Sequence, residues 1–201
     1  MTRSSAVAAA PWDRSATHVE QTAQEIIGSS ALSSAALARY LHGLPGVDEV
    51  GAKGRAAMLS TRSIKTTSKA WALDMTIRMM DLTTLEGADT PGKVRGLVAK
   101  ARTPEPGDPD CPSPAAVCVY NDLVPIALAA AEGTGIKVAA VSTAFPSGRA
   151  SREVRLADTK DAVDAGAHEI DMVIDRGAFL AGDYARVYED IALVREVCQS
   201  R

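Results

Sequence analysis

The chain has 201 residues, of which 46% are hydrophobic and 23% are charged, and its formal net charge is -3. This composition is typical of a soluble globular protein with one sizeable core, and it favours neither nucleic acid nor an anionic membrane as a partner. The three cysteines (Cys111, Cys118 and Cys198) are irregularly spaced and no stretch reaches transmembrane length, so we expect a reducing, cytoplasmic location without disulfides or bound zinc.

Residues 1–69 are predicted to form an N-terminal helical extension. Thr17 to Ile27 and Ser33 to Leu41 have helical spacing with Ser and Thr available as N-caps. The segment Gly43-Leu44-Pro45-Gly46 interrupts this region. The basic stretch from Lys53 to Lys69 is expected to be a solvated helical face and not a ligand site.

Residues 70–201 alternate between short apolar stretches and helical stretches. The predicted strands lie within Met79 to Leu85, Ala116 to Tyr120, Lys137 to Thr143 and His168 to Asp175. The predicted helices are Thr90 to Lys100, Leu123 to Glu132, Arg152 to Ala165 and Tyr184 to Val197. This alternation favours an α/β fold with a parallel sheet and right-handed crossovers, either open or closed into a barrel.

The fourth predicted strand carries a carboxylate in an unusual place. Alternation puts Glu169, Asp171 and Val173 on one face and apolar residues on the other. A buried mid-strand aspartate is costly unless it is paired, so either a structural cation holds Asp171 or it serves proton transfer. His168 falls on the face opposite Asp171 and Asp175, and we therefore expect no metal site.

Polar residues also mark the other predicted strands. Because the carboxyl ends of parallel strands form the ligand-binding edge of α/β folds, we expect several of them to converge there. This set comprises Asp81, Thr83, Cys118, Tyr120, Ser142, Thr143 and Asp171. For Ser142 and Thr143, the simpler interpretation that they begin a loop fits equally well.

Four segments together resemble the deoxyribose-phosphate aldolases. They are Asp81-Leu82-Thr83-Thr84-Leu85, Ala116-Val117-Cys118-Val119-Tyr120, Phe145-Pro146-Ser147-Gly148 and Glu169-Ile170-Asp171-Met172-Val173-Ile174. Their order and spacing are similar to those of that family's first four βα units, and the likeness runs from about Ala70 onward. The resemblance implies a (β/α)8 TIM barrel, of which this chain carries about the first half after its extension.

The resemblance also implies an activity and its residues. Members of the family are class I aldolases, which cleave 2-deoxy-D-ribose 5-phosphate to glyceraldehyde 3-phosphate and acetaldehyde through a Schiff base on lysine. Asp171 matches the proton-shuttling aspartate, and Asp81 and Thr83 match positions beside the substrate. Cys118 matches a cysteine near the pocket that the chemistry does not require, and a small buried apolar role fits it equally well. No cofactor is expected.

The lysine that this chemistry needs is not found at a matching position. Class I aldolases require a neutral lysine amine, which the family carries on its sixth strand. Lys137, at the start of the third predicted strand, lies at the end opposite the catalytic face. The other lysines fall in helical patterns or in the extension: Lys53, Lys65, Lys69, Lys93, Lys100 and Lys160. We therefore expect an incomplete barrel that is inactive alone.

A half barrel would leave two open strand edges and an uncovered interior face. We expect the chain to be marginally stable, to form homo-oligomers, or to depend on a complementary C-terminal half. Three interpretations stay open: a deoxyribose-phosphate aldolase acting on sugar phosphates and aldehydes, a non-catalytic half-barrel binding or assembly module, and another barrel lyase or isomerase.

Overall fold

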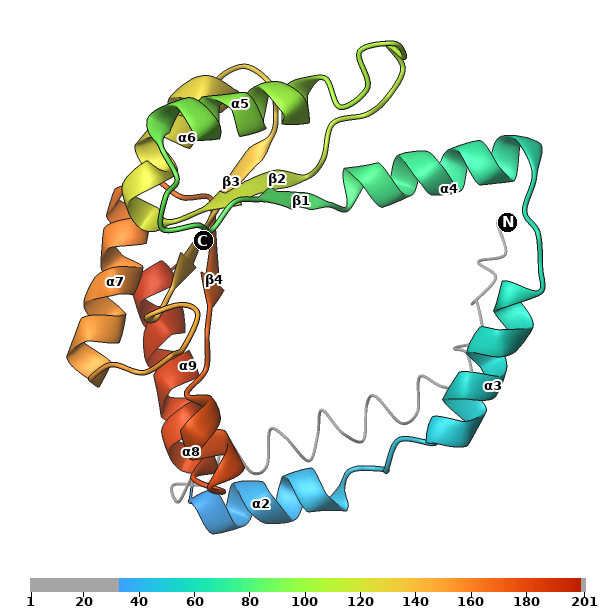
Figure 1. The fold of residues 1–201 in the computed structure, drawn as a ribbon. Coiled ribbons are helices and arrows are strands. Elements are labelled where there is room, and N and C mark those ends of the chain that lie inside the picture. Colours follow the sequence, from blue (N-terminus) through green and yellow to red (C-terminus); the bar gives the residue numbers. More distant parts are fainter. Residues whose placement is uncertain (1–32, 200–201) are drawn as a thin grey trace, which may run out of the picture.

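The computed structural model describes residues 33–199, which form a four-stranded parallel sheet with helices and a helical extension (Figure 1). The helix expected at Thr17 to Ile27 lies outside the described residues. The strands are β1 (Asp81–Thr83), β2 (Ala116–Val119), β3 (Lys137–Ser142) and β4 (Glu169–Met172). Each strand pairs with the next in the chain, so β1 and β4 are the edges. A doubly wound sheet reverses this order at a switch point, whereas a barrel keeps it, so the sheet is that of a partial barrel.

Helices connect the strands and cover one face of the sheet. These are α5 (Pro91–Arg102), the short η1 (Asn121–Leu123) with α6 (Val124–Ala131), and α7 (Arg152–Asp164). The main core lies between them and the sheet, and its central members are Val94, Val98, Val117, Val119 and Val138. Each fully buried valine contributes roughly 1.5–3 kcal/mol. The predicted α/β class and the predicted alternation of strands and helices are confirmed.

Helix boundaries follow ordinary capping chemistry. The hydroxyl of Thr90 accepts the Lys93 N–H at 3.2 Å ahead of Pro91, and Ser151 caps α7 through the Val154 N–H at 3.4 Å. Two details differ from the sequence prediction. β4 ends at Met172, and an unpredicted helix, α8 (Arg176–Leu180), follows it because Asp175 caps its amino end. The helix α9 (Tyr184–Cys198) comes next and confirms the last predicted helix.

The other face of the sheet is called the open face here, and it carries Asp81, Thr83, Cys118, Glu169 and Asp171. Its buried cluster is small, consisting of Cys118, Ala139 and Val141 with partly buried Leu85, Tyr120 and Phe145 packed against it. The two end strands present exposed polar side chains on this face. Within residues 33–199, no helix packs on the open face, so one side of the sheet meets solvent.

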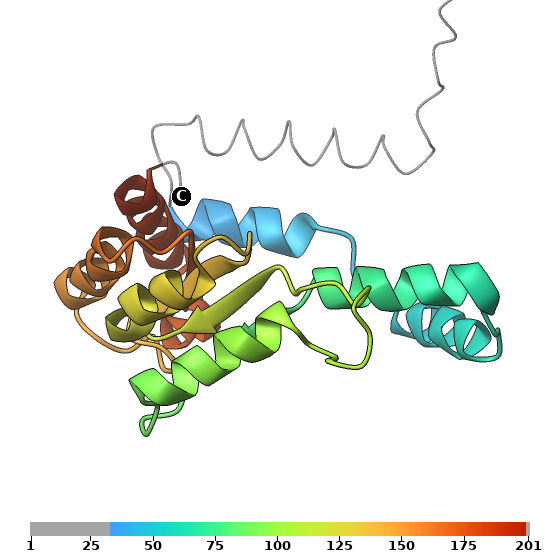
Figure 2. The ribbon, with the colours of Figure 1, turned by 90° about the horizontal axis from the view of Figure 1, so that it is seen from above.

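The described part of the extension, from residue 33 onward, consists of α2 (Ser34–Gly43), α3 (Glu49–Ser60) and α4 (Thr66–Arg78), and it arches away from the sheet (Figures 1 and 2). Of these three helices, α2 is docked on α9: the Ser34 hydroxyl accepts the Ala185 N–H at 3.1 Å and donates to Asp183 at 3.1 Å. The helix α4 runs across the boundary expected at residues 69 and 70. No helix among residues 33–199 is long and apolar enough to cross a membrane.

Large apolar side chains remain exposed on the undocked helices of the extension. Trp71 of α4 is 64% exposed, and Met79, which follows α4, is 74% exposed. Side chains of this size are normally covered in a folded protein. The extension therefore carries apolar surface that the described part of the chain leaves uncovered.

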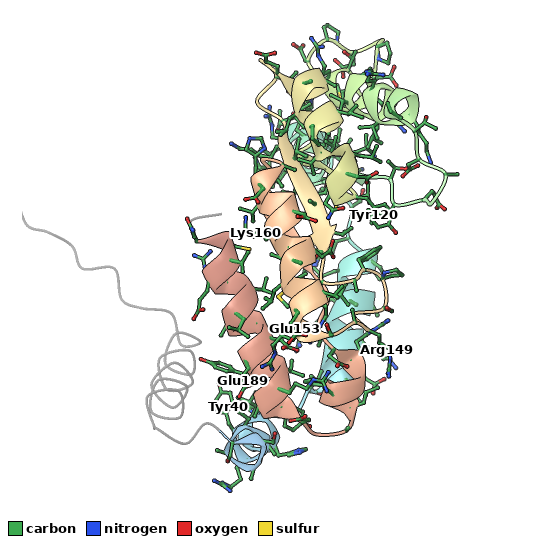
Figure 3. All side chains as sticks on the ribbon, turned by 90° about the vertical axis from the view of Figure 1, so that its left-hand side faces the viewer. Tyr40, Tyr120, Arg149, Glu153, Lys160 and Glu189 are labelled. Atoms are coloured by element: carbon green, nitrogen blue, oxygen red, sulfur yellow. The ribbon has the colours of Figure 1, made fainter. Side chains whose placement is uncertain are left out.

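A buried ion-pair network joins α7 to α9, which lie side by side in Figure 3. Asp190 of α9 accepts hydrogen bonds from Arg155 at 2.7 Å and from Arg152 at 2.8 Å. Arg155 is only 3% exposed, so its charge is compensated inside the protein. Glu189 bonds the same Arg152 at 3.1 Å from an exposed position.

We predict that Asp190→Asn lowers the free energy of unfolding by about 3–5 kcal/mol, because it leaves the Arg155 charge buried without a counter-ion. The matched variant Glu189→Gln removes a solvent-exposed partner and should cost about 0–1 kcal/mol. Urea unfolding followed by circular dichroism measures both values. Equal losses for the two variants would contradict the importance of the buried pair.

Candidate active site

The strand register arranges the polar residues of the open face in rows. Thr83, Cys118, Ala139 and Glu169 are successive partners across the four strands. Asp171 lies further toward the carboxyl ends of the strands, paired with Val141. The sheet therefore brings Thr83, Cys118, Glu169 and Asp171 to one face, as the alternation of the sequence predicts.

Asp171 is exposed on this face, so the expectation that it is buried is wrong for this chain. Its neighbours along β4 alternate between exposed and half-buried positions, and only Ile170 belongs with the main core. The physical reason is that β4 is an edge strand and its open face has no covering layer among residues 33–199. The predicted orientation toward the interior of a barrel holds, but the predicted desolvation does not.

Asp81 lies further from Asp171 than the sequence suggests. It is the first residue of β1 and is in register with Ala116 and Lys137, at the amino ends of the strands. Asp171 is aligned with Val141, four positions along β3 from Lys137. Asp81 therefore does not lie with the polar residues expected at the carboxyl ends of the strands, because β1 is only three residues long and begins with it.

Cys118 occupies the centre of the open face and is 4% exposed. Burial, together with the smaller effects of the carboxylates of Asp171, Asp81 and Glu169, raises the pKa of its thiol to about 11. A thiolate at this position would be desolvated and would be repelled by three like charges. Cys118 is consequently a neutral thiol at physiological pH, which fits a packing role and not a nucleophilic one.

Thr143 is a structural feature of the site that the loop interpretation of the sequence misses. It follows β3 with φ of 62°, and Ala144 has φ of 60°. This left-handed geometry costs a β-branched residue roughly 1–3 kcal/mol. The Thr143 hydroxyl accepts the Val173 N–H at 2.7 Å and lies 2.7 Å from the Val173 carbonyl oxygen. Ser142 ends β3 and Thr143 begins the turn that follows, as the loop interpretation expects of Thr143, but both side chains are buried.

A carboxylate on α7 holds the ends of β2 and β3. Asp158 accepts the side-chain amide of Asn121, which follows β2, at 2.8 Å. Its other oxygen accepts the Ala144 N–H at 3.0 Å. Because one carboxylate bonds groups after two strands, the carboxyl edge of the sheet is cross-linked by side chains as well as by its backbone ladder.

Asp175 is used structurally and not as a partner of Asp171. It accepts the Ala178 N–H at 3.0 Å, pairs with Arg186 at 2.9 Å and is 9% exposed. The hydrogen bond from Ala178 lowers the pKa of Asp175, and Arg186 lowers it further against the opposing effect of burial. Among residues 33–199 there is no cluster of three or more His, Cys, Asp or Glu residues suited to a metal ion.

All seven lysines fall within the described part of the chain, and they lie away from the carboxyl half of the open face. Lys53 and Lys160 pair with exposed carboxylates on their own helices, and Lys93 pairs with Asp89, which precedes α5. Lys137 begins β3 at the amino end of the sheet. The remaining three are exposed on or beside α4 and α5: Lys65, Lys69 and Lys100.

We predict that Asp171→Asn lowers the pKa of the Cys118 thiol from its value of about 11, because the substitution removes a negative charge that opposes thiolate formation. The pH dependence of the Cys118 Cβ chemical shift measures this value. The control Asp161→Asn removes a charge from the exposed surface of α7 and should leave the Cys118 pKa unchanged. A Cys118 pKa that is insensitive to Asp171→Asn would contradict the placement of the Asp171 carboxylate near the thiol.

Several known proteins are similar to this chain in sequence, although no protein-family model matches it. The deoxyribose-phosphate aldolase of Mus musculus is 37% identical over 147 residues, covering 68% of this chain and 46% of the mouse protein. The human protein of the same name is 37% identical over 139 residues, covering 64% of this chain and 43% of its own length. The chain thus spans less than half the length of these relatives.

Solved structures agree with the sequence matches. A protein of Coccidioides immitis assigned as a deoxyribose-phosphate aldolase superposes with a TM-score of 0.56 at 29% identity, covering 63% of this chain and 47% of that one. A Toxoplasma gondii protein with the same assignment gives a TM-score of 0.55 at 22% identity over 68% of this chain and 53% of that one, which supports the fold alone. Over about two thirds of its length this chain is thus similar in sequence to proteins named deoxyribose-phosphate aldolase, and it shares with such proteins a partial α/β barrel.

Proposed function

We propose that this chain provides the proton-transfer carboxylate of a class I aldolase that cleaves 2-deoxy-D-ribose 5-phosphate in deoxyribonucleoside catabolism. The observation that carries the proposal is the position of Asp171 on the open face, near the carboxyl ends of the strands, where its charge acts on the Cys118 thiol. A chain related to aldolases, with a carboxylate at this place, has the group that a Schiff-base mechanism needs for proton exchange.

In this mechanism a lysine amine attacks the sugar carbonyl, and the resulting carbinolamine loses water to form an iminium ion. Asp171 would move protons to and from the carbinolamine oxygen, directly or through water. The C3 hydroxyl would then lose its proton as the C2–C3 bond breaks, which releases glyceraldehyde 3-phosphate and leaves an enamine on the lysine. Protonation of the enamine carbon would give an imine, and hydrolysis of the imine would release acetaldehyde and the lysine amine. Thr83 and Asp81, lower on the same face, would contact the substrate, while Cys118 would only pack beneath it.

Two further components would be needed for catalysis. The first is a lysine near Asp171, because the seven lysines of this chain lie elsewhere. The second is a covering layer, since Asp171 is exposed on the open face. In a covered site burial raises the pKa of a carboxylate while a neighbouring ammonium lowers it, and this balance suits a group that must both give and take protons.

We further propose that residues 1–69 act as an extension and residues 70–201 as part of the barrel domain of a cytoplasmic protein. The open edges β1 and β4 and the open face would then be covered by a complementary C-terminal half or by another copy of the chain. A non-catalytic half-barrel binding or assembly module is the second candidate, and the exposure of Asp171 favours it for the isolated chain.

We predict that acetaldehyde and sodium borohydride leave no reduced adduct on the isolated chain, because no lysine lies beside Asp171. Intact-mass spectrometry measures the adduct, and the mouse relative serves as the positive control. An adduct that peptide mapping locates on one lysine would contradict this prediction and would identify the nucleophile.

A chimera tests the role of Asp171 directly. Residues 70–199 of this chain replace the corresponding segment of the mouse aldolase, and cleavage of 2-deoxy-D-ribose 5-phosphate is measured with a coupled assay. We predict that Asp171→Asn lowers kcat by about 100-fold or more, the usual contribution of a positioned acid–base group. The matched variant Asp161→Asn, on the exposed surface of α7, should retain kcat. Full activity of the Asp171→Asn chimera would favour the third interpretation, a different barrel lyase or isomerase.

A further inference from the structure

The strand β3 leaves the sheet abruptly, and its departure creates a gap in the backbone ladder. The last paired residues of β3 and β4 are Ser142 and Met172. Thr143 and Ala144 then adopt left-handed φ values of 62° and 60°, which turn the main chain away from β4. Val173, the first residue after β4, would therefore have no backbone partner on the segment that follows β3.

The Thr143 side chain takes the place of that missing backbone partner. Its hydroxyl accepts the Val173 N–H at 2.7 Å and is 2.7 Å from the Val173 carbonyl oxygen, so it contacts both polar groups of one residue. Thr143 is 1% exposed. Water therefore has little access to replace these bonds. The left-handed backbone of Thr143 is strained, and it is retained because it brings the hydroxyl to Val173.

Two further contacts join the turn after β3 to the segment after β4. Gly148 has φ of 69°, and a Cβ atom built on it would lie 2.6 Å from the Ile174 carbonyl oxygen. The turn therefore approaches β4 more closely than any side chain would permit. The Arg176 guanidinium donates to the Pro146 carbonyl oxygen at 3.1 Å. The turn thus contacts three residues after β4, namely Val173, Ile174 and Arg176.

The turn is itself anchored from the opposite side. Asp158 of α7 accepts the Ala144 N–H at 3.0 Å while also holding Asn121, which follows β2. A series of hydrogen bonds consequently links the end of β2, through Asp158 of α7 and the turn after β3, to the end of β4. Asp171 lies on β4, two residues before Val173. Among residues 33–199, β4 has a neighbouring strand on one side only.

We propose that residues Thr143 to Gly148 form a clamp that fixes the end of the edge strand β4, and that Thr143 is thereby a positioning residue for Asp171. The clamp is a property of this chain, whereas its catalytic meaning rests on the proposed function. Thr143 touches neither substrate nor reacting atoms in this scheme. It acts through the backbone of Val173.

The test uses the full 201-residue chain and NMR measurement of amide hydrogen exchange and order parameters at residues 171–173. Thr143→Val preserves the shape of the side chain and removes the hydroxyl. We expect it to accelerate exchange of the Val173 amide by about tenfold or more and to lower the order parameters at Asp171 and Val173. Thr143→Ser keeps the hydroxyl and should restore both values.

Thr134→Val is the matched control for a general loss of stability. The Thr134 hydroxyl also bonds two backbone groups, because it donates to the Ala131 carbonyl oxygen at 2.6 Å and accepts the Ile136 N–H at 3.1 Å. Thr134 lies between α6 and β3, at the opposite end of β3 from Thr143. Its variant should leave the exchange rate of the Val173 amide, relative to the amides of β3, unchanged. The clamp is overturned if Thr143→Val leaves Val173 unchanged, or if Thr134→Val loosens Val173 equally. A chimera insensitive to Asp171→Asn would instead refute the proposed function and leave the clamp intact.

Discussion

Helices α5, α6 and α7 cover one face of the parallel sheet, and within residues 33–199 no element covers the other. A parallel sheet is ordinarily buried on both faces, because its crossover helices or a closed barrel interior supply the second layer. Here the covered face holds the valine-rich core, while the open face holds Thr83, Cys118 and the carboxylates. The environment of Asp171 is consequently set by what lies above the sheet, and this chain alone exposes it.

The carboxyl edge of the sheet is organised even though the open face is uncovered. Asp158 joins the ends of β2 and β3, and Thr143 joins the ends of β3 and β4. These bonds are made by side chains from turns and from α7, so they do not require a second layer. This chain therefore contains the contacts that fix the strand ends on the side that would face a substrate. It does not bury the carboxylate of Asp171, and burial is what tunes a catalytic carboxylate.

The sequence predicts the order of elements well because each strand and helix has its own local signal. Alternation places Asp171 on the correct face, and the helices predicted to start at Thr90 and Arg152 are confirmed as α5 and α7. The exposure of Asp171 could not be predicted from the same pattern, because it depends on whether another layer covers the open face.

The role of Thr143 could not be predicted either, because a threonine after a strand is usual at the beginning of a loop. Only the left-handed turn brings its hydroxyl to Val173. The cap signal at Asp175 was present, but α8 is too short to show helical periodicity.

The relatives are more than twice as long as the segment they share with this chain, and the apolar side chains left exposed on α4 indicate surface that another layer would cover. The central claim is that the open face forms one wall of an aldolase site. A crystal structure of the chimera with the mouse relative, reduced by borohydride in the presence of acetaldehyde, tests it most directly. The account predicts that the Asp171 carboxylate lies within hydrogen-bond reach of the reduced lysine adduct, at about 3 Å or through one water. An adduct on the far side of the barrel wall from Asp171 would contradict it.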